Sequence, residues 1–178
     1  MNLKGLYIAN STAMLLVSSV LIGAFYFQFG LGENPCPLCL LQRIGMIGVI
    51  FGLSLNTYFG LKKEHFGIVI LSALVGSAFS IRQILLHICP VAGEPTGYGT
   101  AVLGMHLYSW AVVIYVASII GSVVFLFFIK DEKKETERKP FTYEKFTFYL
   151  SVLLIFINVV ATFFECHFGP CCENGPCP

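Results

Sequence analysis

Two cysteines separated by two residues, Cys36 and Cys39, stand where an apolar segment of the chain begins. Thiols at this spacing can close a small disulfide ring, the arrangement of redox-active Cys-x-x-Cys motifs. If a helix begins near Pro37, its N-terminal peptide dipoles favour a thiolate at either cysteine. Arg43 lies four residues after Cys39, on the same helical face, and adds positive potential there. The spacing predicts a redox-active dithiol; a structural disulfide, or a zinc site completed by two further thiols, is the alternative.

The chain has seven cysteines, and the other five lie far from this pair. An odd number leaves at least one thiol unpaired within a monomer, unless a partner or a metal takes it. Four of them lie in a short polar tail rich in Gly and Pro, which has too little apolar material to fold alone. We expect a mobile tail suited to thiol exchange, with a structural Cys166–Cys171 bridge or metal chelation by cysteines and His167 as alternatives. The five cysteines are Cys89, Cys166, Cys171, Cys172 and Cys177.

Two arginines, Arg43 and Arg82, fall inside apolar segments. Charged side chains are costly in hydrocarbon, so a functional role is the default interpretation. We expect both at comparable depths, where they could donate to the carbonyl oxygen of a membrane-soluble quinone. Pairing with Glu33 or Glu94, or snorkelling to lipid headgroups, is the alternative.

Three further polar residues lie at a similar depth. Gln83 and His87 are four residues apart and share a helical face, and His106 opens the next apolar segment. A histidine at a membrane surface is usually only an interfacial polar residue. Two facing histidines could also ligate a haem.

The composition is that of a polytopic membrane protein. Of 178 residues, 56% are hydrophobic and only 12% are charged, and the mean hydropathy is +0.79. Soluble domains carry about 25% charged residues. The net charge is +1 and no basic stripe suits nucleic acid. Spans of about 20 apolar residues are predicted near Leu6–Phe29, Leu40–Leu61, Phe66–Ile88, Met105–Ile129 and Phe146–Phe164.

The basic residues outside these spans all fall on one side of the predicted membrane, and the cysteine clusters fall on the other. The positive-inside rule makes the basic side cytoplasmic. The N-terminus is then inside and the C-terminus outside, where disulfides form and persist. The basic residues are Lys4, Lys62, Lys63, Lys130, Lys133, Lys134, Arg138, Lys139 and Lys145.

The predicted fold class is an all-α membrane protein, a four-helix transmembrane bundle plus a fifth spanning helix. The core takes residues 1–130, with the redox loop at 30–39 and a second outer loop at 89–104 that is rich in Gly and Pro. A charged cytoplasmic loop at 131–145 leads to the fifth helix at 146–164. The cysteine-rich tail at 165–178 faces outward.

Three stretches resemble the DsbB family, the disulfide bond formation proteins of the bacterial inner membrane. They are Phe27-Gln28-Phe29 followed by Pro35-Cys36-Pro37-Leu38-Cys39-Leu40-Leu41-Gln42-Arg43, then Arg82-Gln83-Ile84-Leu85-Leu86-His87, and Gly104-Met105-His106-Leu107-Tyr108-Ser109-Trp110. The resemblance covers roughly residues 10–130. It implies a protein thiol:quinone oxidoreductase that reoxidises a periplasmic dithiol oxidase of the DsbA type, which has a thioredoxin fold.

By matching position, the resemblance makes Cys36 and Cys39 the pair that passes electrons to ubiquinone or menaquinone. It sets Arg43 at the quinone, with Arg82 and His87 as further candidate contacts. Because Cys39 is nearer the membrane and Arg43, we expect a Cys39 thiolate to reduce the quinone, while Cys36 forms mixed disulfides.

The chain departs from the family pattern in its partner-facing cysteines. The second outer loop usually carries two cysteines, and here it holds only Cys89. A tail pair on the same outer side is expected to replace them. Cys166 and Cys171 are the first choice, and Cys89, Cys172 and Cys177 are the contenders.

Two other functional classes remain open. One is a quinone-linked oxidoreductase of the vitamin K epoxide reductase type, although in that family the quinone-side pair sits late in the helix bundle. The other is a metal-handling membrane protein without enzymatic activity, in which the Cys and His side chains of the tail act as a chelator.

Overall fold

The structure is a computed structural model of the whole chain. It describes residues 3–88, 97–129, 139–166, 171–172 and 175–176, and their side chains as far as Cys166. Cys89 and Cys177 lie outside the described residues, as does most of the predicted cytoplasmic loop.

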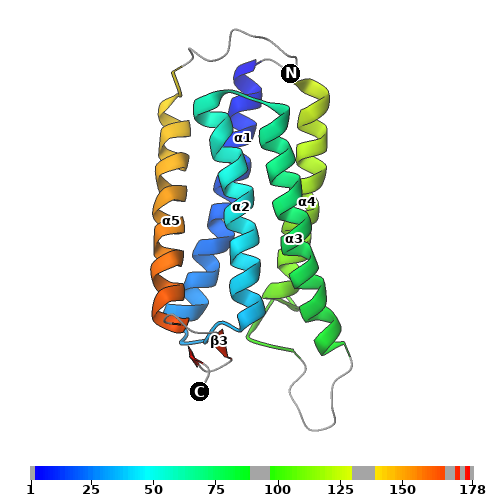
Figure 1. Cartoon of the computed structure of the whole chain (residues 1–178), viewed down its shortest axis with the longest axis vertical. Helices are drawn as coiled ribbons and strands as arrows, with labels where there is room; N and C mark the ends of the chain where they lie inside the picture. The colour runs from blue at the N-terminus through cyan, green and yellow to red at the C-terminus, as the bar shows by residue number, and fades with distance from the viewer. Residues whose placement is uncertain (1–2, 89–96, 130–138, 167–170, 173–174, 177–178) are drawn as a thin grey trace.

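Within the described residues, five helices are long and apolar enough to cross a membrane, and they run side by side along the molecule (Figure 1). The five predicted spans are therefore confirmed as helices, with ends that differ by a few residues. The helices are α1 (Leu3–Phe25, continued by a π-helical turn at Tyr26–Gly30), α2 (Pro37–Phe59), α3 (Lys63–His87), α4 (Leu107–Phe128) and α5 (Thr142–Cys166).

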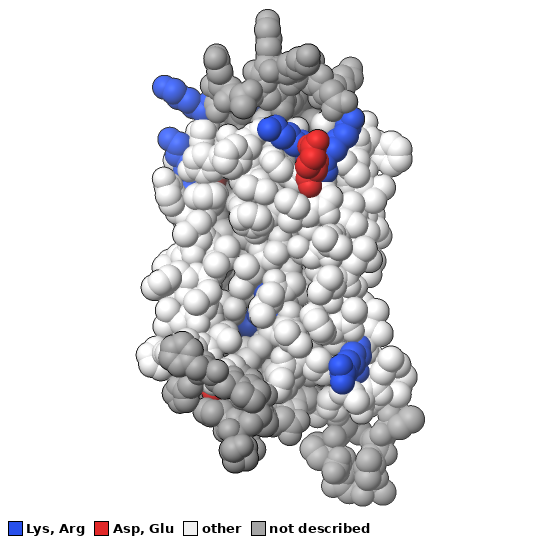
Figure 2. Space-filling model, viewed as in Figure 1, with Lys and Arg blue, Asp and Glu red and all other residues white. Residues whose placement is uncertain are grey.

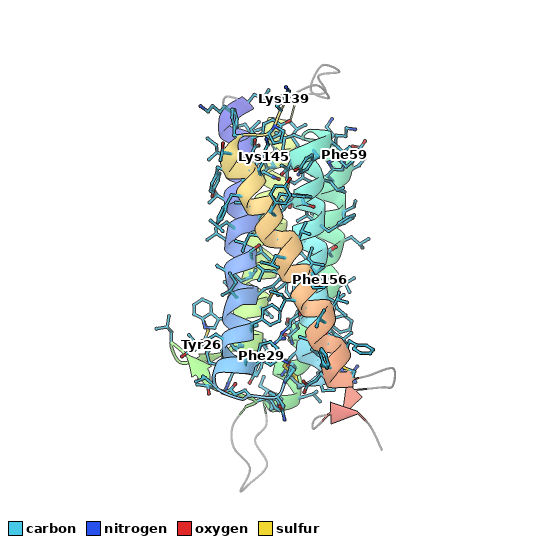
Figure 3. The ribbon with its side chains drawn as sticks, turned by 90° about the vertical axis from the view of Figure 1, so that its left-hand side faces the viewer. Tyr26, Phe29, Phe59, Lys139, Lys145 and Phe156 are labelled. Atoms are coloured by element: carbon cyan, nitrogen blue, oxygen red, sulfur yellow. A yellow bond between two sulfur atoms is a disulfide. The ribbon has the colours of Figure 1, made fainter. Side chains whose placement is uncertain are left out.

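The first four helices form a bundle in chain order. Helix α1 packs on α2, α2 on α3 and α3 on α4, whereas α1 and α4 touch only sparsely. Helix α5 lies outside this bundle and packs along α1, with a smaller contact to α2. Figure 3 shows α5 crossing over that side of the bundle. The predicted fold class, a four-helix bundle plus one added helix, is confirmed.

Glycines let α2, α3 and α4 approach one another closely. A Cβ on Gly45 would come 2.7 Å from the Cα of Gly76, and a Cβ on Gly76 would overlap the ring of Tyr115. The Tyr115 side chain is fully buried, and its hydroxyl donates to the main-chain carbonyl of Gln42. Small residues at helix contacts are the usual means of close packing between apolar helices in lipid. This contact fixes α4 against the first half of α2.

Polar side chains also join the helices. Asn56 of α2 donates to the Oδ1 of Asn10 on α1 at 2.9 Å, and the Nδ1 of His65 on α3 lies 3.0 Å from the Oδ1 of Asn56. Helix α5 is joined to α1 through the hydroxyls of Ser18 and Ser151, which are 3.1 Å apart. Such hydrogen bonds hold apolar helices together where the surrounding lipid offers no partner.

Lysines gather at one end of the bundle. Lys62 and Lys63 stand at the connection from α2 to α3, and Figure 3 shows Lys139 and Lys145 at the same end as Phe59 of α2. In Figure 2 this end carries most of the charge on the visible face, above a band that is largely uncharged. This distribution agrees with the predicted one. The orientation of the chain in the membrane stays a prediction.

The opposite end holds the redox loop and two short hairpins. Strands β1 (Ala101–Val102) and β2 (Met105–His106) pair antiparallel, as do β3 (Cys171–Cys172) and β4 (Gly175–Pro176). Figure 1 places β3 at the end of the bundle where α2 begins. The segments that carry the cysteines of the predicted site therefore meet at one end of the molecule.

The first hairpin differs from the irregular loop that the sequence predicts. Because β2 takes up Met105 and His106, the fourth helix begins at Leu107 and not at the predicted Met105. Leu103 and Gly104 have positive φ values of 52° and 79°, which turn the chain back on itself between β1 and β2. Two such residues in succession are the signature of a tight two-residue hairpin turn.

Candidate functional site

Cys36 and Cys39 form a disulfide at the start of α2, with their Cα atoms 5.0 Å apart. Cys36 is the N-cap residue, with extended backbone angles, and Pro37 follows as the first helical residue. The main-chain N–H of Cys39 donates to the Sγ of Cys36 at 3.1 Å. A proline at this position loses no hydrogen bond, because the first N–H groups of a helix have no partner within it. The predicted helix start is thus observed, and the sulfur of Cys36 takes the place of a capping oxygen.

One glutamine contacts the disulfide and a second glutamine bonds to the first, and the sequence pattern assigns a role to neither of them. The Nε2 of Gln83 lies 3.2 Å from the Sγ of Cys36 and 3.6 Å from the Sγ of Cys39. The Nε2 of Gln42 donates to the Oε1 of Gln83 at 2.6 Å. Both side chains are buried. Their signal in the sequence was the presence of an amide inside an otherwise apolar helix, where polar groups need partners.

Arg43 is buried beside the disulfide, with 7% of its surface exposed. Its Nη1 donates to the Oε1 of Gln28 at 2.5 Å and its Nη2 donates to the main-chain carbonyl of Ala24 at 3.2 Å. Its guanidinium carbon lies 5.3 Å from the centre of the Phe25 ring. These partners sit at or beside the π-helical turn that ends α1. Such turns occur often at functional sites because they change the register of the helix.

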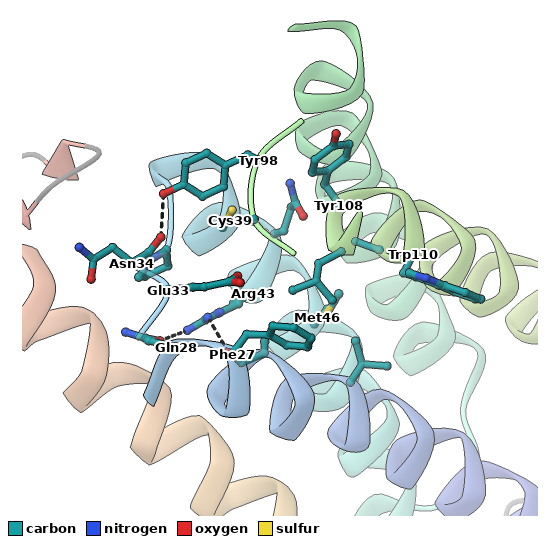
Figure 4. A pocket seen from close by; sticks show the side chains of 17 residues that line it. Phe27, Gln28, Glu33, Asn34, Cys39, Arg43, Met46, Tyr98, Tyr108 and Trp110 are labelled. Atoms are coloured by element: carbon teal, nitrogen blue, oxygen red, sulfur yellow. Dashed lines mark hydrogen bonds between the residues drawn. The ribbon is translucent and has the colours of Figure 1, made fainter. Parts of the chain in front are cut away.

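A cavity of about 100 Å³ opens next to Cys39 and Arg43 (Figure 4). Cys39 lines this cavity, whereas Cys36 does not. Its walls are mostly apolar and aromatic, and they come from α1, the redox loop, α2, the second outer loop and α4. They include Ala24, Phe27, Met46, Tyr108 and Trp110. The site therefore joins a disulfide, a buried cation and an apolar chamber.

A second cavity of about 150 Å³ lies deeper in the bundle. Like the first cavity, it lies between α1 and α4, which make few contacts with each other. Its lining includes Val17, Ile114 and Phe125. The two cavities follow one another along α1 and α4.

The second outer loop is fastened onto the redox loop. The hydroxyl of Tyr98 donates to the main-chain carbonyl of Asn34 at 2.7 Å. The main-chain N–H of Thr100 donates to the Glu33 carboxylate at 3.2 Å, and the Thr100 hydroxyl also contacts that carboxylate. Glu33 therefore anchors the loop, and Arg43 finds its partners in Gln28 and Ala24.

The other predicted quinone contacts, Arg82 and His87, do not line the cavity themselves. Arg82 is exposed on α3 and does not line the cavity. The ring of His87 stacks on Tyr108, with centroids 5.6 Å apart, and its Nδ1 lies 2.8 Å from the main-chain oxygen of Gln83. His106 stacks on Tyr108 as well, at 5.3 Å. A tyrosine that packs on both histidines occupies the space that a haem between them would need, while His87 contacts the cavity wall through Tyr108.

Cys166 ends α5 and is engaged in a disulfide. Its predicted pairing with Cys171 stays a prediction, because the side chains of Cys171 and Cys172 lie outside the described part of the structure. Only the backbone of these two residues is described, in β3.

Most of the chain matches a family of known proteins. The family model described as "Disulfide bond formation protein DsbB" matches residues 8–125, which include most of α1, all of α2 and α3, and most of α4. Helix α5 and the tail lie beyond the matched residues. No solved structure matches the chain.

Among curated proteins, the chain is similar to several named "Disulfide bond formation protein B". It is 38% identical to that of Chromobacterium violaceum over 99 residues, which cover 51% of this chain and 60% of the relative. It is 38% identical to that of Cupriavidus necator over 90 residues (47% and 56%), and 30% identical to that of Pseudomonas syringae pv. tomato over 137 residues (60% and 80%). The chain thus spans about half to two thirds of the first two relatives.

The family match covers well over half of the chain and contains the Cys36–Cys39 disulfide, Arg43 and Gln83. Together with the five apolar helices, it makes this a multi-pass membrane protein. The chain belongs to the DsbB family of disulfide bond formation proteins.

Proposed function

We propose that this chain is a protein thiol:quinone oxidoreductase that supports disulfide bond formation. In this role it reoxidises a periplasmic dithiol oxidase of the DsbA type and passes the electrons to membrane quinone. The observation that carries the proposal is the Cys36–Cys39 disulfide at the edge of an apolar cavity that also contains the buried Arg43 guanidinium. The name shared by the relatives, "Disulfide bond formation protein B", supports it.

The residues of the cavity suit a quinone, either ubiquinone or menaquinone. The ring of such a molecule is apolar and its carbonyl oxygens accept hydrogen bonds, so apolar walls with one buried guanidinium match it. Arg43 would orient a carbonyl oxygen, and Cys39 would be the sulfur facing the ring. A bound quinone would accept two electrons and two protons. The second cavity along α1 and α4 has the apolar lining that an isoprenoid tail requires.

The partner would meet the protein at the end of the bundle that holds the redox loop. A reduced partner thiol attacks an outer disulfide, and internal exchange then reduces Cys36–Cys39. We propose that Cys166 and a second tail cysteine form the outer disulfide, with Cys171 as first choice. Cys89, Cys172 and Cys177 remain contenders.

The proposed location is the bacterial inner membrane, with the N-terminus in the cytoplasm and the C-terminus in the periplasm. The lysines at one end of the bundle and the disulfides at the other support this orientation.

Quinone reduction by purified protein, with a reduced DsbA-type partner, tests the proposal. We expect turnover in the wild type, its loss in Cys36→Ser and Cys39→Ser, and a lower rate in Arg43→Ala. In Cys39→Ser, Cys36 should still form a mixed disulfide, because only the cavity-facing sulfur is lost. Full quinone reduction by Cys39→Ser would contradict the assigned sulfur.

Absence of turnover with either quinone, in folded wild-type protein, would contradict the proposed activity. Measurement of bound metal in the same sample would then test the metal-handling alternative.

A further inference from the structure

The groups that hold Arg43 in place carry no charge. Its two Nη atoms donate to the amide oxygen of Gln28 and to the main-chain carbonyl of Ala24, and the Phe25 ring lies beside it. These contacts fix the direction of the guanidinium, but none of them compensates its positive charge. A buried charge among apolar helices is costly unless an opposite charge lies near it. The compensating anion therefore has to come from a residue further away.

Glu165 of the added helix α5 is the acidic residue whose charge acts on Arg43. It is the last residue but one of α5 and is partly exposed, and its carboxylate interacts electrostatically with the guanidinium. Within the described part of the chain, Glu33 is the other acidic side chain at this end of the bundle. Its carboxylate binds the main-chain N–H and the hydroxyl of Thr100 and so anchors the second outer loop.

A third cavity, of about 300 Å³, lies between α5 and the π-helical turn, and Glu165 lines it. Gln28 lines this cavity and also the cavity beside Cys39. The Oε1 of Gln28 accepts from Arg43, and Figure 4 shows its amide nitrogen at the end that points away from Arg43. The Gln28 side chain is thus the wall between the cavity of Glu165 and the cavity that contains the guanidinium.

The remaining walls of the third cavity are mostly apolar, with aromatic side chains such as Phe156 and Phe164. Little water can enter such a space when lipid surrounds it. An electrostatic interaction across an apolar, poorly solvated gap is weakened less than one across water. A carboxylate on α5 can therefore influence the cavity beside Cys39 without touching its contents.

We propose that Glu165 sets the charge preference of the cavity beside Cys39, by compensating Arg43 from α5 across Gln28. Arg43 then still donates to the carbonyl oxygen of a neutral quinone, while the cavity attracts an anion less strongly. Helix α5 lies beyond residues 8–125, which match the family, so this compensation is a property of the added helix. The identity of the ligand rests on the proposed function, whereas the charge preference can be measured without turnover.

Tryptophan fluorescence measures binding to this cavity directly, because Trp110 is the single tryptophan of the chain and lines the cavity. Two probes of similar size differ in charge. Menadione is uncharged, and lawsone, a hydroxynaphthoquinone, is an anion at neutral pH. Each is titrated into the full-length, disulfide-bonded protein in an uncharged detergent. The ratio of the two Kd values, lawsone over menadione, reports the charge preference and cancels changes that affect both probes equally.

Glu165→Gln removes the charge and keeps the size of the side chain. It should lower the Kd ratio by roughly threefold to tenfold, the effect of one partly screened charge. Glu165→Asp keeps the charge and should keep the ratio near the wild-type value, which a purely structural role of the side chain would not require. If Glu165→Gln fails to fold, Glu165→Ala carries the same measurement.

Glu64→Gln is the matched control. Glu64 is exposed in the first turn of α3, at the opposite end of the bundle, and the substitution makes the same chemical change. The Kd ratio of this variant should equal that of the wild type.

A wild-type Kd ratio in folded Glu165→Gln would overturn the inference. A lower ratio in Glu33→Gln but not in Glu165→Gln would also overturn it, because Glu33 would then be the compensating residue. A lower ratio in Glu165→Gln, in protein that reduces no quinone, would support the inference and overturn only the proposed function. Failure of both probes to bind the wild type would overturn the quinone cavity and the inference together.

Discussion

Arg43 is held on three sides, and this fixes the direction of its charge. Gln28 and the Ala24 carbonyl each accept from a different Nη atom, and the Phe25 ring lies beside the guanidinium. A planar guanidinium can satisfy two acceptors and still present a further N–H to the cavity, whereas an ammonium on a flexible stem cannot keep this geometry.

Arg43→Lys should therefore lower kcat/KM for the quinone by roughly tenfold to a hundredfold, the cost of about one hydrogen bond to a charged group. Quinone titration at saturating partner measures it. Arg82→Ala is the comparison, because Arg82 is also an arginine in an apolar helix but is exposed and away from the cavity. We expect kcat/KM of Arg82→Ala to stay within about twofold of the wild-type value.

An equal loss of kcat/KM in Arg43→Lys and Arg82→Ala would instead indicate that Arg82 contacts the quinone, as the sequence predicts.

Among the helices, the contact of α2, α3 and α4 at Gly45, Gly76 and Tyr115 holds the site in place. It lies directly behind Gln42, so the same packing that joins the helices also positions the amides beside the sulfurs.

Gly76→Ala should destabilise the protein by about 1–3 kcal/mol, because the added methyl group overlaps the Tyr115 ring. Thermal unfolding in detergent measures the change. Gly67→Ala on the same helix is the control, since nothing lies within 4 Å of its added Cβ. That substitution should leave the stability unchanged or raise it slightly, because alanine favours a helix over glycine. Equal stability of the two variants would contradict the tight packing.

Elements set by local signals were predictable from the sequence. Continuous apolar runs predicted the five helices, and Cys36-Pro37 predicted where α2 begins, because capping depends on adjacent residues. The predicted start of α4 differs from the observed start by two residues. The reason is the β1–β2 hairpin, which depends on a positive φ at Leu103 that residues other than glycine rarely adopt.

The contacts of Gln42 and Gln83 could not be predicted, because they depend on how α2 and α3 are rotated against each other. The same holds for the partners of Arg43, which depend on a π-helical turn that apolar composition does not signal.

At the scale of the whole molecule, the disulfide-bonded cysteines among the described side chains lie in two parts of the chain. The Cys36–Cys39 disulfide lies in the region that matches the family, and Cys166 ends a helix that lies beyond it. A partner protein needs an accessible disulfide, whereas we expect a small dithiol to reduce the partly buried Cys36–Cys39 pair directly.

Cys166→Ser should therefore abolish quinone reduction driven by a DsbA-type partner and retain most of the turnover driven by dithiothreitol. Cys36→Ser should abolish both. Parallel assays with the two reductants on the same protein samples measure the difference. Full partner-driven turnover in Cys166→Ser would mean that another cysteine receives the partner's electrons.

The π-helical turn at Tyr26–Gly30 determines how the length of this segment can vary. A π turn accommodates an extra residue relative to an α turn, so a chain shorter by one residue here would continue as an unbroken α-helix. Each residue of an α-helix rotates the next by about 100°. Loss of one residue would therefore turn Gln28 away from Arg43. It would also change the direction in which the redox loop leaves α1 and leads to Cys36. We therefore expect substitution of the exposed Tyr26 side chain to be tolerated, and a change in the number of residues between α1 and the disulfide to disturb the site.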